Sequence, residues 1–346
     1  MHFYDGQVSI KVPRPPLEMV DDVLTISKCG ATSSAMNYLV NLFMFSKKFV
    51  LNKSKYICPK LFIQKDIIKY SEHEKYLGEV IHQNGKKHAT LVDRLAKGYG
   101  IISNIIALID DIPLGHRRVQ IGLELKQAWL INGLLYNSEI WQQMTEKDKR
   151  DLNKIDHILL RKILGSHSQA PVEQLYLETA SLSLTDIIKI RRLIYLQVIL
   201  QRPEGELIKQ VYNAMKADPL PDDWSQLIQK DMSDMNLEYS DQEILNMTPT
   251  FYNKIIKEKV RAHSFIHLKE FQTNHEKGRM NSHSDHKNPQ DYLTTNKLTN
   301  KQMSLLFNLR CNSVSGIRAN FPKQYFGDLE CRLCRKEQDS QIHLLQ

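Results

Sequence analysis

The sequence has few cysteines for its length and no long apolar run. Its five cysteines, an odd number scattered over 346 residues, do not form the pattern of a disulfide framework, so a reducing compartment is expected. No apolar run reaches the roughly 18 residues needed to cross a bilayer, and the opening MHFYDGQ lacks the basic-then-apolar pattern of a secretion signal. These absences argue against membrane and secreted classes and predict an intracellular protein. A nuclear location is compatible with them, but the sequence does not specify it.

Several nucleotide-binding and protease motifs are also missing from the sequence. It contains no Walker A pattern and no glycine pattern of a dinucleotide-binding turn. His263 and His267 lie four residues apart on a predicted helix, but HSFIH lacks the glutamate of the metalloprotease motif H-E-x-x-H. We therefore expect these two histidines to be partly buried or solvated.

The composition is that of a globular protein with a basic charge balance. Hydrophobic residues make up 42% and charged residues 25% of the chain, which is long enough for two or three packed units. Lysine and arginine number 47 against 39 aspartates and glutamates, a formal net charge of +8. This balance is compatible with a polyanionic partner such as RNA or DNA, although many soluble proteins are as basic without one.

Hydrophobic periodicity divides the first half of the chain into two regions. Residues 1–85 contain short alternating runs typical of strands, with one amphipathic helix, and the turn signature NGKK follows them. Residues 86–165 have helical periodicity. Thr145 is the expected N-cap and Gly165 the expected C′ glycine of the last helix in this region. The apolar positions with helical spacing are Leu91, Leu95, Ile102, Ile105, Ile106 and Ile109.

The second half of the chain is predicted to be helical, with polar breaks. Residues 166–300 include the helix LTDIIKIRRLIYLQVIL, the breaker KADPLPDDW and the polar stretch NHEKGRMNSHSDHKNPQD. Residues 301–346 form a short tail with three of the five cysteines. No internal repeat is found. The predicted fold class is therefore α+β and mostly helical.

Two adjacent aspartates near the start of the chain are candidate metal ligands. In LEMVDDVLTI, Asp21 and Asp22 separate two apolar runs, a pattern that predicts a tight hairpin with both carboxylates at its tip. Carboxylate oxygens suit Mg²⁺, which in phosphoryl-transfer sites is shared with substrate phosphates. The alternative is a solvated acidic turn, which is common chemistry.

The tail contains a second candidate metal site. Cys331 and Cys334 have C-x-x-C spacing, and His343 follows eight residues later. Two thiolates at this spacing can bind one tetrahedral Zn²⁺, and the histidine supplies a third ligand. The alternative is a pair of free surface thiols.

Taken in order, these motifs resemble reverse transcriptases of retrotransposons that lack long terminal repeats. PPLEMVDDVLTISKCG resembles the catalytic motif, with Met19 and Val20 before the two aspartates, and FVLNKSKYI is similar to the motif that follows it. KYLGEVI is similar to the primer grip. The residues of the last two motifs that match the family are Leu51, Asn52, Lys55, Tyr76, Leu77 and Gly78.

The resemblance continues over nearly the full length and implies a domain order. It implies a partial palm over 1–85, a helical thumb over 86–165 that includes LINGLLYNSEIW, a helical connection region over 166–300, and a zinc-knuckle-like tail over 301–346. It also implies Mg²⁺ or Mn²⁺ as cofactor, with Asp21 and Asp22 as catalytic ligands. In a thumb, phosphate contacts could come from Arg117, Arg118, Lys147, Lys149, Arg150, Arg161 and Lys162, although each could equally belong to a solvated helix face.

The sequence departs from the family pattern at both ends. A two-metal polymerase needs a further carboxylate from another strand and residues that grip the nucleotide, and no motif here matches them. The fourth ligand expected after His343 is also missing, because the chain ends at Gln346. The chain is thus expected to be the C-terminal part of such an enzyme and inactive by itself, with the missing half as a candidate partner. The alternatives are a non-catalytic nucleic-acid-binding remnant and a helical protein whose motifs are coincidental.

Overall fold

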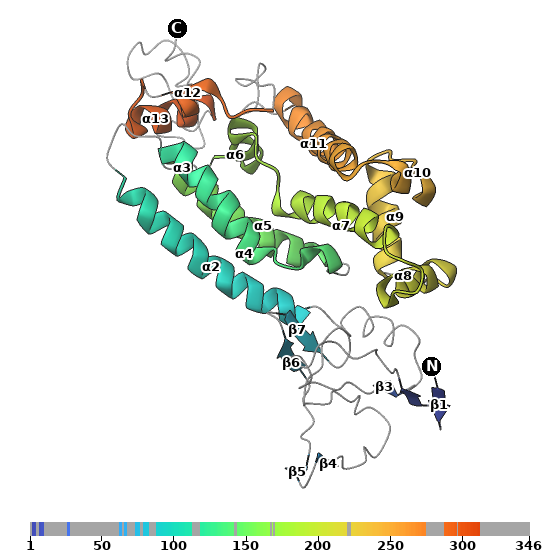
Figure 1. Cartoon of the computed structure of the whole chain (residues 1–346). Helices are drawn as coiled ribbons and strands as arrows, with labels where there is room; N and C mark the ends of the chain where they lie inside the picture. Colours follow the sequence, from blue (N-terminus) through green and yellow to red (C-terminus); the bar gives the residue numbers. More distant parts are fainter. Residues whose placement is uncertain are drawn as a thin grey trace, which may run out of the picture. The chain divides into compact units, whose positions relative to one another are not determined.

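A computed structural model of the chain describes mainly its helical part. The described residues are 2–4, 7–9, 26–27, 62–63, 66–67, 73–76, 79–82, 88–112, 118–141, 144–166, 168, 170–219, 223–274, 287–295 and 297–311. This part is mostly helical, as predicted (Figure 1). None of its helices combines the length and the apolar character needed to cross a membrane. The chain divides into two compact units: unit 1 contains residues 1–96, 137–148 and 189–256, and unit 2 the remaining segments.

The described strands of unit 1 are short and antiparallel. β2 pairs with β1 on one side and β3 on the other, β4 pairs with β5, and β6 pairs with β7. The stretch KYLGEVI contributes to two strands, because β6 ends at Tyr76 and β7 begins at Glu79. Their bounds are β1 His2–Tyr4, β2 Gln7–Ser9, β3 Ile26–Ser27, β4 Phe62–Ile63, β5 Asp66–Ile67, β6 His73–Tyr76 and β7 Glu79–His82.

A single threonine ties β7 to the helix that follows it. The hydroxyl of Thr90, in the first turn of α2 (His88–Asp110), accepts a hydrogen bond from the backbone N–H of Val80 at 3.3 Å and donates one to its carbonyl at 2.9 Å. The sequence NGKK, predicted to form a turn, lies between these two elements in the chain and outside the described residues. Thr90 thereby holds the start of α2 against β7.

Three helical rods form the core of unit 2. They are α2 from residue 97 on, the continuous rod of α3 (Arg118–Leu125), η2 (Lys126–Ile131) and α4 (Asn132–Leu134), and α5 (Glu146–Leu164) from residue 149 on. Glycines allow the rods to approach closely, since a Cβ added at Gly122 would lie 2.7 Å from Cγ1 of Ile163. The predicted helical period of α2 is confirmed, because Leu91, Ile102, Ile105 and Ile109 are buried.

The ends of α5 are the ones predicted from the sequence. At its start, Thr145 Oγ1 accepts from the N–H of Asp148 at 3.1 Å, and the Asp148 carboxylate accepts from the N–H of Thr145 at 3.0 Å. At its end, Gly165 has φ +61°, and Ser166 N donates to the carbonyl of Arg161 at 2.9 Å. These are a capping box and a Schellman ending, and both satisfy helix-end groups locally.

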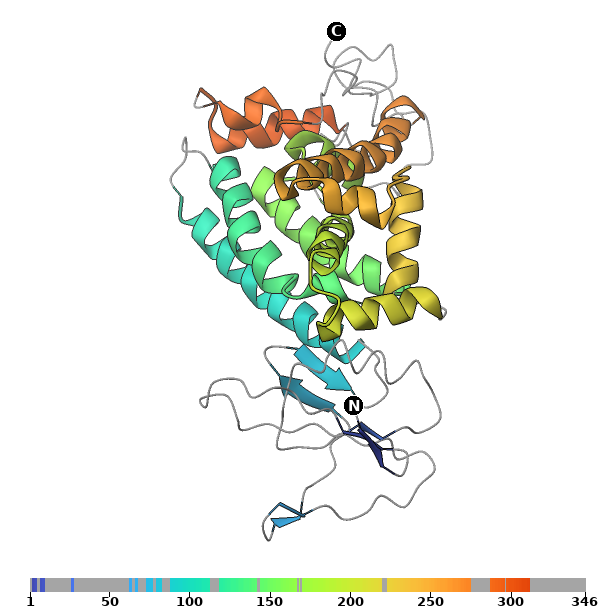
Figure 2. The ribbon, with the colours of Figure 1, turned by 45° about the vertical axis from the view of Figure 1, so that its right-hand side comes forward.

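The remaining helices of unit 2 are held by polar contacts to its core. Arg310, in α13 (Asn300–Arg310), donates from Nε to Oε1 of Glu178 in α6 (Val172–Thr179) at 2.6 Å. Ser304 donates to the carbonyl of Gly165 at 2.6 Å. The short α12 (Asp291–Thr294) packs against α3. In Figure 2, α12 lies in the orange-red part of the ribbon and α3 in the green part. α13 thus contacts the glycine that ends α5 and the last turn of α6.

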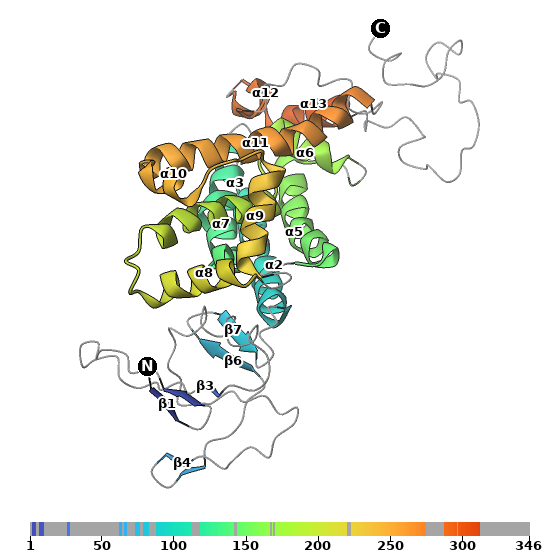
Figure 3. The ribbon, with the colours of Figure 1, turned by 90° about the vertical axis from the view of Figure 1, so that its right-hand side faces the viewer.

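The helices of unit 1 pack around Trp224. α7 (Leu184–Leu200) matches the predicted helix at both ends and belongs to this unit from residue 189 on. The unit also contains η3 (Ser138–Ile140), α8 (Leu207–Ala217), α9 (Trp224–Asp234), α10 (Asp241–Asn246) and the start of α11 (Pro249–Asn274). α9 runs between α8 and α10 (Figure 3). The rings of Tyr195 and Tyr212 each meet Trp224 edge-on at 6.1 Å, and the Trp224 indole donates to the carbonyl of Glu139 at 2.7 Å.

Candidate nucleic-acid interface

Most residues predicted to form functional sites lie outside the described part of the chain. The structure describes Tyr76 of the primer-grip motif and, of the seven thumb cations, all but Arg117. Tyr76 is the last residue of β6 and pairs with Glu79 across the hairpin. The candidate site residues that lie outside the described part of the chain are Asp21, Asp22, Lys55, Leu77, Gly78, Arg117, Cys331, Cys334 and His343.

Arg118 is engaged in contacts inside unit 2. Its Nη2 donates to Oδ1 of Asp110 at 2.9 Å and to the carbonyl of Lys162 at 3.1 Å, and its side chain is 20% exposed. Lys162 Nζ lies 3.4 Å from the other Asp110 oxygen. One carboxylate therefore meets two cations, and Arg118 joins the end of α2, the start of α3 and the end of α5. Its position favours a role in packing over one in binding.

Arg161 is also committed to an internal contact. It donates to the carbonyl of Ala170 at 3.2 Å across the connection between α5 and α6. The Arg161 side chain is half-buried and links the last turn of α5 to the segment before α6. Of the seven basic residues assigned to the thumb, Arg118, Arg161 and Lys162 thus hold the fold together at one end of α5.

The other end of α5 presents a different set of cations. Lys147, Arg150 and Lys154 are exposed and have no hydrogen-bond or ion-pair partner among the described residues. Because they follow one another at i, i+3 and i+7, they share one face of the helix. We call these three residues the α5 cation stripe. Asp151, half-buried, lies on the same side of the helix, so the stripe with this aspartate carries a net charge of +2.

A buried polar cluster sets which face of α5 turns inward. Lys126 Nζ lies 2.8 and 2.9 Å from the two carboxylate oxygens of Asp156, and the Tyr176 hydroxyl donates to Asp156 at 3.2 Å. Asp156 is fully buried. Asp156 and Lys154 are two residues apart, about 200° around a helix of 3.6 residues per turn. Burial of Asp156 therefore keeps the α5 cation stripe on the outside.

The same cluster perturbs two neighbouring titratable groups. Burial raises the pKa of Tyr176 well above its usual value, and the Asp156 carboxylate raises it further. His157 meets the Tyr176 ring edge-on at 5.6 Å, and burial lowers the pKa of His157 from 6.5 to about 4. The cluster is thus built around a neutral histidine and a neutral phenol at pH 7.

The π-helix η2 begins at Lys126 and was not predicted. Lys126 contacts Asp156, which is 30 residues away in the sequence, so no local pattern in the sequence indicates this irregular turn. π-helical turns are often found at functional sites. Two large aromatic side chains nearby, Trp129 and Tyr136, are 46% and 44% exposed.

Sequence reasoning also passed over exposed cations on α11. Lys254, Lys257 and Lys259 are exposed and have no partner among the described residues. The signal was present in NKIIKEKVR, where lysines and apolar residues interleave at helical spacing. On the same helix, His263 is half-buried and His267 exposed, as predicted, with ring centroids 5.6 Å apart.

The part of the chain that the structure describes brings no three histidine, cysteine or carboxylate side chains into a metal-binding group. Comparison with protein-family models, curated proteins and solved structures gives no match. The candidate site is therefore a helical surface with exposed cations that have no partner among the described residues. Such a surface can make contacts with phosphates by charge, independent of base sequence.

Proposed function

We propose that this chain binds nucleic acid through phosphate contacts, as part of a protein related to reverse transcriptases. The α5 cation stripe carries the proposal, because its three side chains are exposed, share one helix face and are left out of the ion pairs that hold the fold. The seven steps along the helix from Lys147 to Lys154 span about 10 Å at 1.5 Å per residue. This length suits contacts to successive phosphates of one strand.

The net charge of the whole chain supports the same proposal. A formal charge of +8 attracts a polyanion over distances longer than any single contact. Phosphate contacts release condensed counterions, so the affinity should fall steeply with salt. The exposed lysines of α11 are a second source of such contacts.

The binding proposal is tested by titrating the full chain with a labelled 20-nucleotide duplex and with the matching single strand. Each titration is repeated at several salt concentrations, and the logarithm of affinity is plotted against the logarithm of salt. For Z neutralised phosphates, the expected slope is about −0.9Z for the duplex and about −0.7Z for the single strand. A slope near zero, or no binding at low salt, would contradict the proposal.

The catalytic part of the proposal rests on the resemblance of the Asp21–Asp22 motif. In a complete polymerase, these carboxylates would hold Mg²⁺ or Mn²⁺, which stabilises the charge of the transferred phosphoryl group. Cys331, Cys334 and His343 would be ligands to a structural Zn²⁺. The proposed partners are accordingly an RNA template and a DNA product.

For primer extension, we expect the chain alone to give no product on an RNA template with Mg²⁺ or Mn²⁺. Its motifs supply two adjacent carboxylates, whereas a two-metal site takes carboxylates from more than one element and needs a grip on the nucleotide. Asp21→Ala is the matched control. Template-dependent extension that disappears in this variant would show that the chain is itself the polymerase.

A further inference from the structure

The second half of α11 presents two histidine side chains on one face of the helix. His263 and His267 are four residues apart, slightly more than one turn. His263 is half-buried and His267 is exposed, and both belong to unit 2. Two imidazoles at this spacing on a helix can bind one metal ion together.

The separation of the two rings fits a shared metal ion. A zinc–nitrogen bond is about 2.0–2.1 Å long, so each ring centre lies about 3.2 Å from a bound ion. Two rings at tetrahedral positions around the ion then have centres about 5.2 Å apart. The observed separation of the ring centroids is 5.6 Å, with an angle of 83° between the rings. Each ring can turn about its bond to the metal, so this angle is compatible with a shared ion.

Glu270 orients the exposed histidine of the pair. Its Oε2 lies 3.8 Å from Nδ1 of His267, three residues further along α11. A carboxylate beside one ring nitrogen favours the proton there and leaves the lone pair of the other nitrogen for a metal. The His263 ring has no hydrogen-bond partner among the described residues, so its nitrogens are available. Glu270 also offsets the charge of Lys259, which is exposed one turn before His263.

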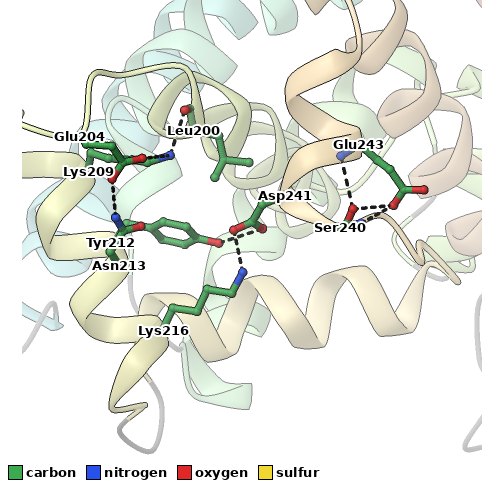
Figure 4. A network of polar contacts seen from close by, with 9 residues as sticks. All are labelled: Leu200, Glu204, Lys209, Tyr212, Asn213, Lys216, Ser240, Asp241 and Glu243. Atoms are coloured by element: carbon green, nitrogen blue, oxygen red, sulfur yellow. Dashed lines mark hydrogen bonds and ion pairs between the residues drawn. The ribbon is translucent and has the colours of Figure 1, made fainter.

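The carboxylates of the polar network between α8 and α10, in unit 1, are occupied by protein donors. Lys216 Nζ lies 2.6 Å from Oδ2 of Asp241, and the Tyr212 hydroxyl lies 3.5 Å from Oδ1 of the same carboxylate (Figure 4). Glu243 accepts from the N–H and the hydroxyl of Ser240 at 2.7 and 2.8 Å. A metal ion at either carboxylate would displace these donors, whereas the two histidines of α11 need no such displacement.

We propose that His263 and His267 bind one Zn²⁺ ion through their ring nitrogens, with water in the remaining positions. Imidazole nitrogen suits Zn²⁺, Ni²⁺ and Cu²⁺, whereas Mg²⁺ prefers oxygen ligands. The site has half the protein ligands of a closed structural zinc site, so we expect a dissociation constant on the order of 10 µM. The ion links two successive turns of α11. This inference is independent of nucleic-acid binding.

The test measures zinc binding to the full chain by competition with a chromophoric chelator. Cys331→Ser/Cys334→Ser serves as the parent protein, so that the thiolates predicted to bind zinc in the tail do not contribute. We expect the parent to bind Zn²⁺, and the same protein with His263→Gln/His267→Gln to bind it at least tenfold more weakly. A large excess of Mg²⁺ should not displace the ion.

Two control variants of the parent test the spacing and the identity of the ligands. Ala262→His/His263→Gln keeps two histidines on α11 but places them five residues apart, about 140° around the helix, so they cannot share an ion. This shifted variant should lose zinc binding as the double glutamine variant does. His283→Gln/His286→Gln removes two histidines that lie outside the described residues, and it should bind zinc like the parent.

Hydrogen exchange gives a local readout of the bridged turn. In the helix, the N–H of His267 bonds to the carbonyl of His263, so a metal that joins the two side chains should slow exchange of this amide at least tenfold. Thermal unfolding without metal checks that each variant folds. Equal zinc affinities for the parent and the double glutamine variant, or full affinity in the shifted variant, would overturn the inference. Neither outcome affects the nucleic-acid proposal, since the α5 cation stripe is unchanged.

Discussion

Asp156 places a carboxylate in the interior of unit 2, where it contacts Lys126 and Tyr176. We expect Asp156→Asn to lower the free energy of unfolding by about 3–5 kcal/mol, because the ammonium of Lys126 would stay buried without a counter-charge. The double change Lys126→Met with Asp156→Leu should cost less than the single change, since it removes both charges. Urea denaturation of the wild-type chain and of the two variants measures both costs.

The matched control for this buried pair is the exposed pair of Arg118 and Asp110. Asp110→Asn should cost at most about 1 kcal/mol, because solvent screens a surface pair. Similar costs for Asp156→Asn and Asp110→Asn would mean that the Lys126–Asp156 pair is not desolvated in solution.

His157 makes the stability of the chain depend on pH. Its pKa is lowered from 6.5 to about 4, so between these values the unfolded chain binds a proton that the folded chain does not. The contribution of His157 is therefore fully present above pH 6.5 and is lost as the pH falls toward 4. Because the ring is partly solvated, we expect an effect on the order of 1 kcal/mol.

Comparison with His157→Gln isolates this titration from that of the carboxylates. Urea midpoints of both proteins are measured from pH 7.5 to 4.5. The wild-type chain should lose more stability than the variant over this range. Parallel curves would mean that His157 titrates in the folded chain with an ordinary pKa.

At the scale of the helices, two glycines should respond in opposite ways to alanine. A Cβ at Gly122 would lie 2.7 Å from Ile163, so Gly122→Ala should force α3 and α5 apart and cost about 1–3 kcal/mol. Gly100 in α2 has nothing within 4 Å of an added Cβ, and Gly100→Ala should stabilise the chain by about 0.5–1 kcal/mol. Thermal unfolding of the two variants compares them directly, and equal shifts would count against the close packing of α3 on α5.

The elements that the sequence predicted well are those determined locally. Thr145 and Gly165 mark the ends of α5 because capping bonds reach only three to five residues along the chain. The sequence predicts less well which cations make internal contacts and which are exposed. Arg161 and Lys154 look alike in the sequence, yet Arg161 bonds to Ala170 and Lys154 has no partner among the described residues, since burial of Asp156 fixes the rotation of α5. That burial depends on Lys126, which is distant in sequence.

A hollow in unit 1 could not be predicted for a related reason. Residues of α8 and α9, two helices separated by a polar breaker, line this hollow of about 470 Å³ and are brought together only by the fold. By contrast, the candidate residues Asp21, Asp22, Cys331, Cys334 and His343 were assigned by motif. They lie outside the described residues and stay predictions.

At the scale of the whole molecule, the central claim is that the α5 cation stripe binds phosphates while Arg118, Arg161 and Lys162 hold the fold. Its most direct test compares Arg150→Ala/Lys154→Ala with Lys230→Ala/Lys301→Ala, which removes the same charge from exposed lysines on α9 and α13. If both stripe residues contact phosphates, the salt slope for duplex binding should become shallower by about 1.8 in the stripe variant. The control variant should keep the wild-type slope. Equal slopes for the two double variants would contradict the account.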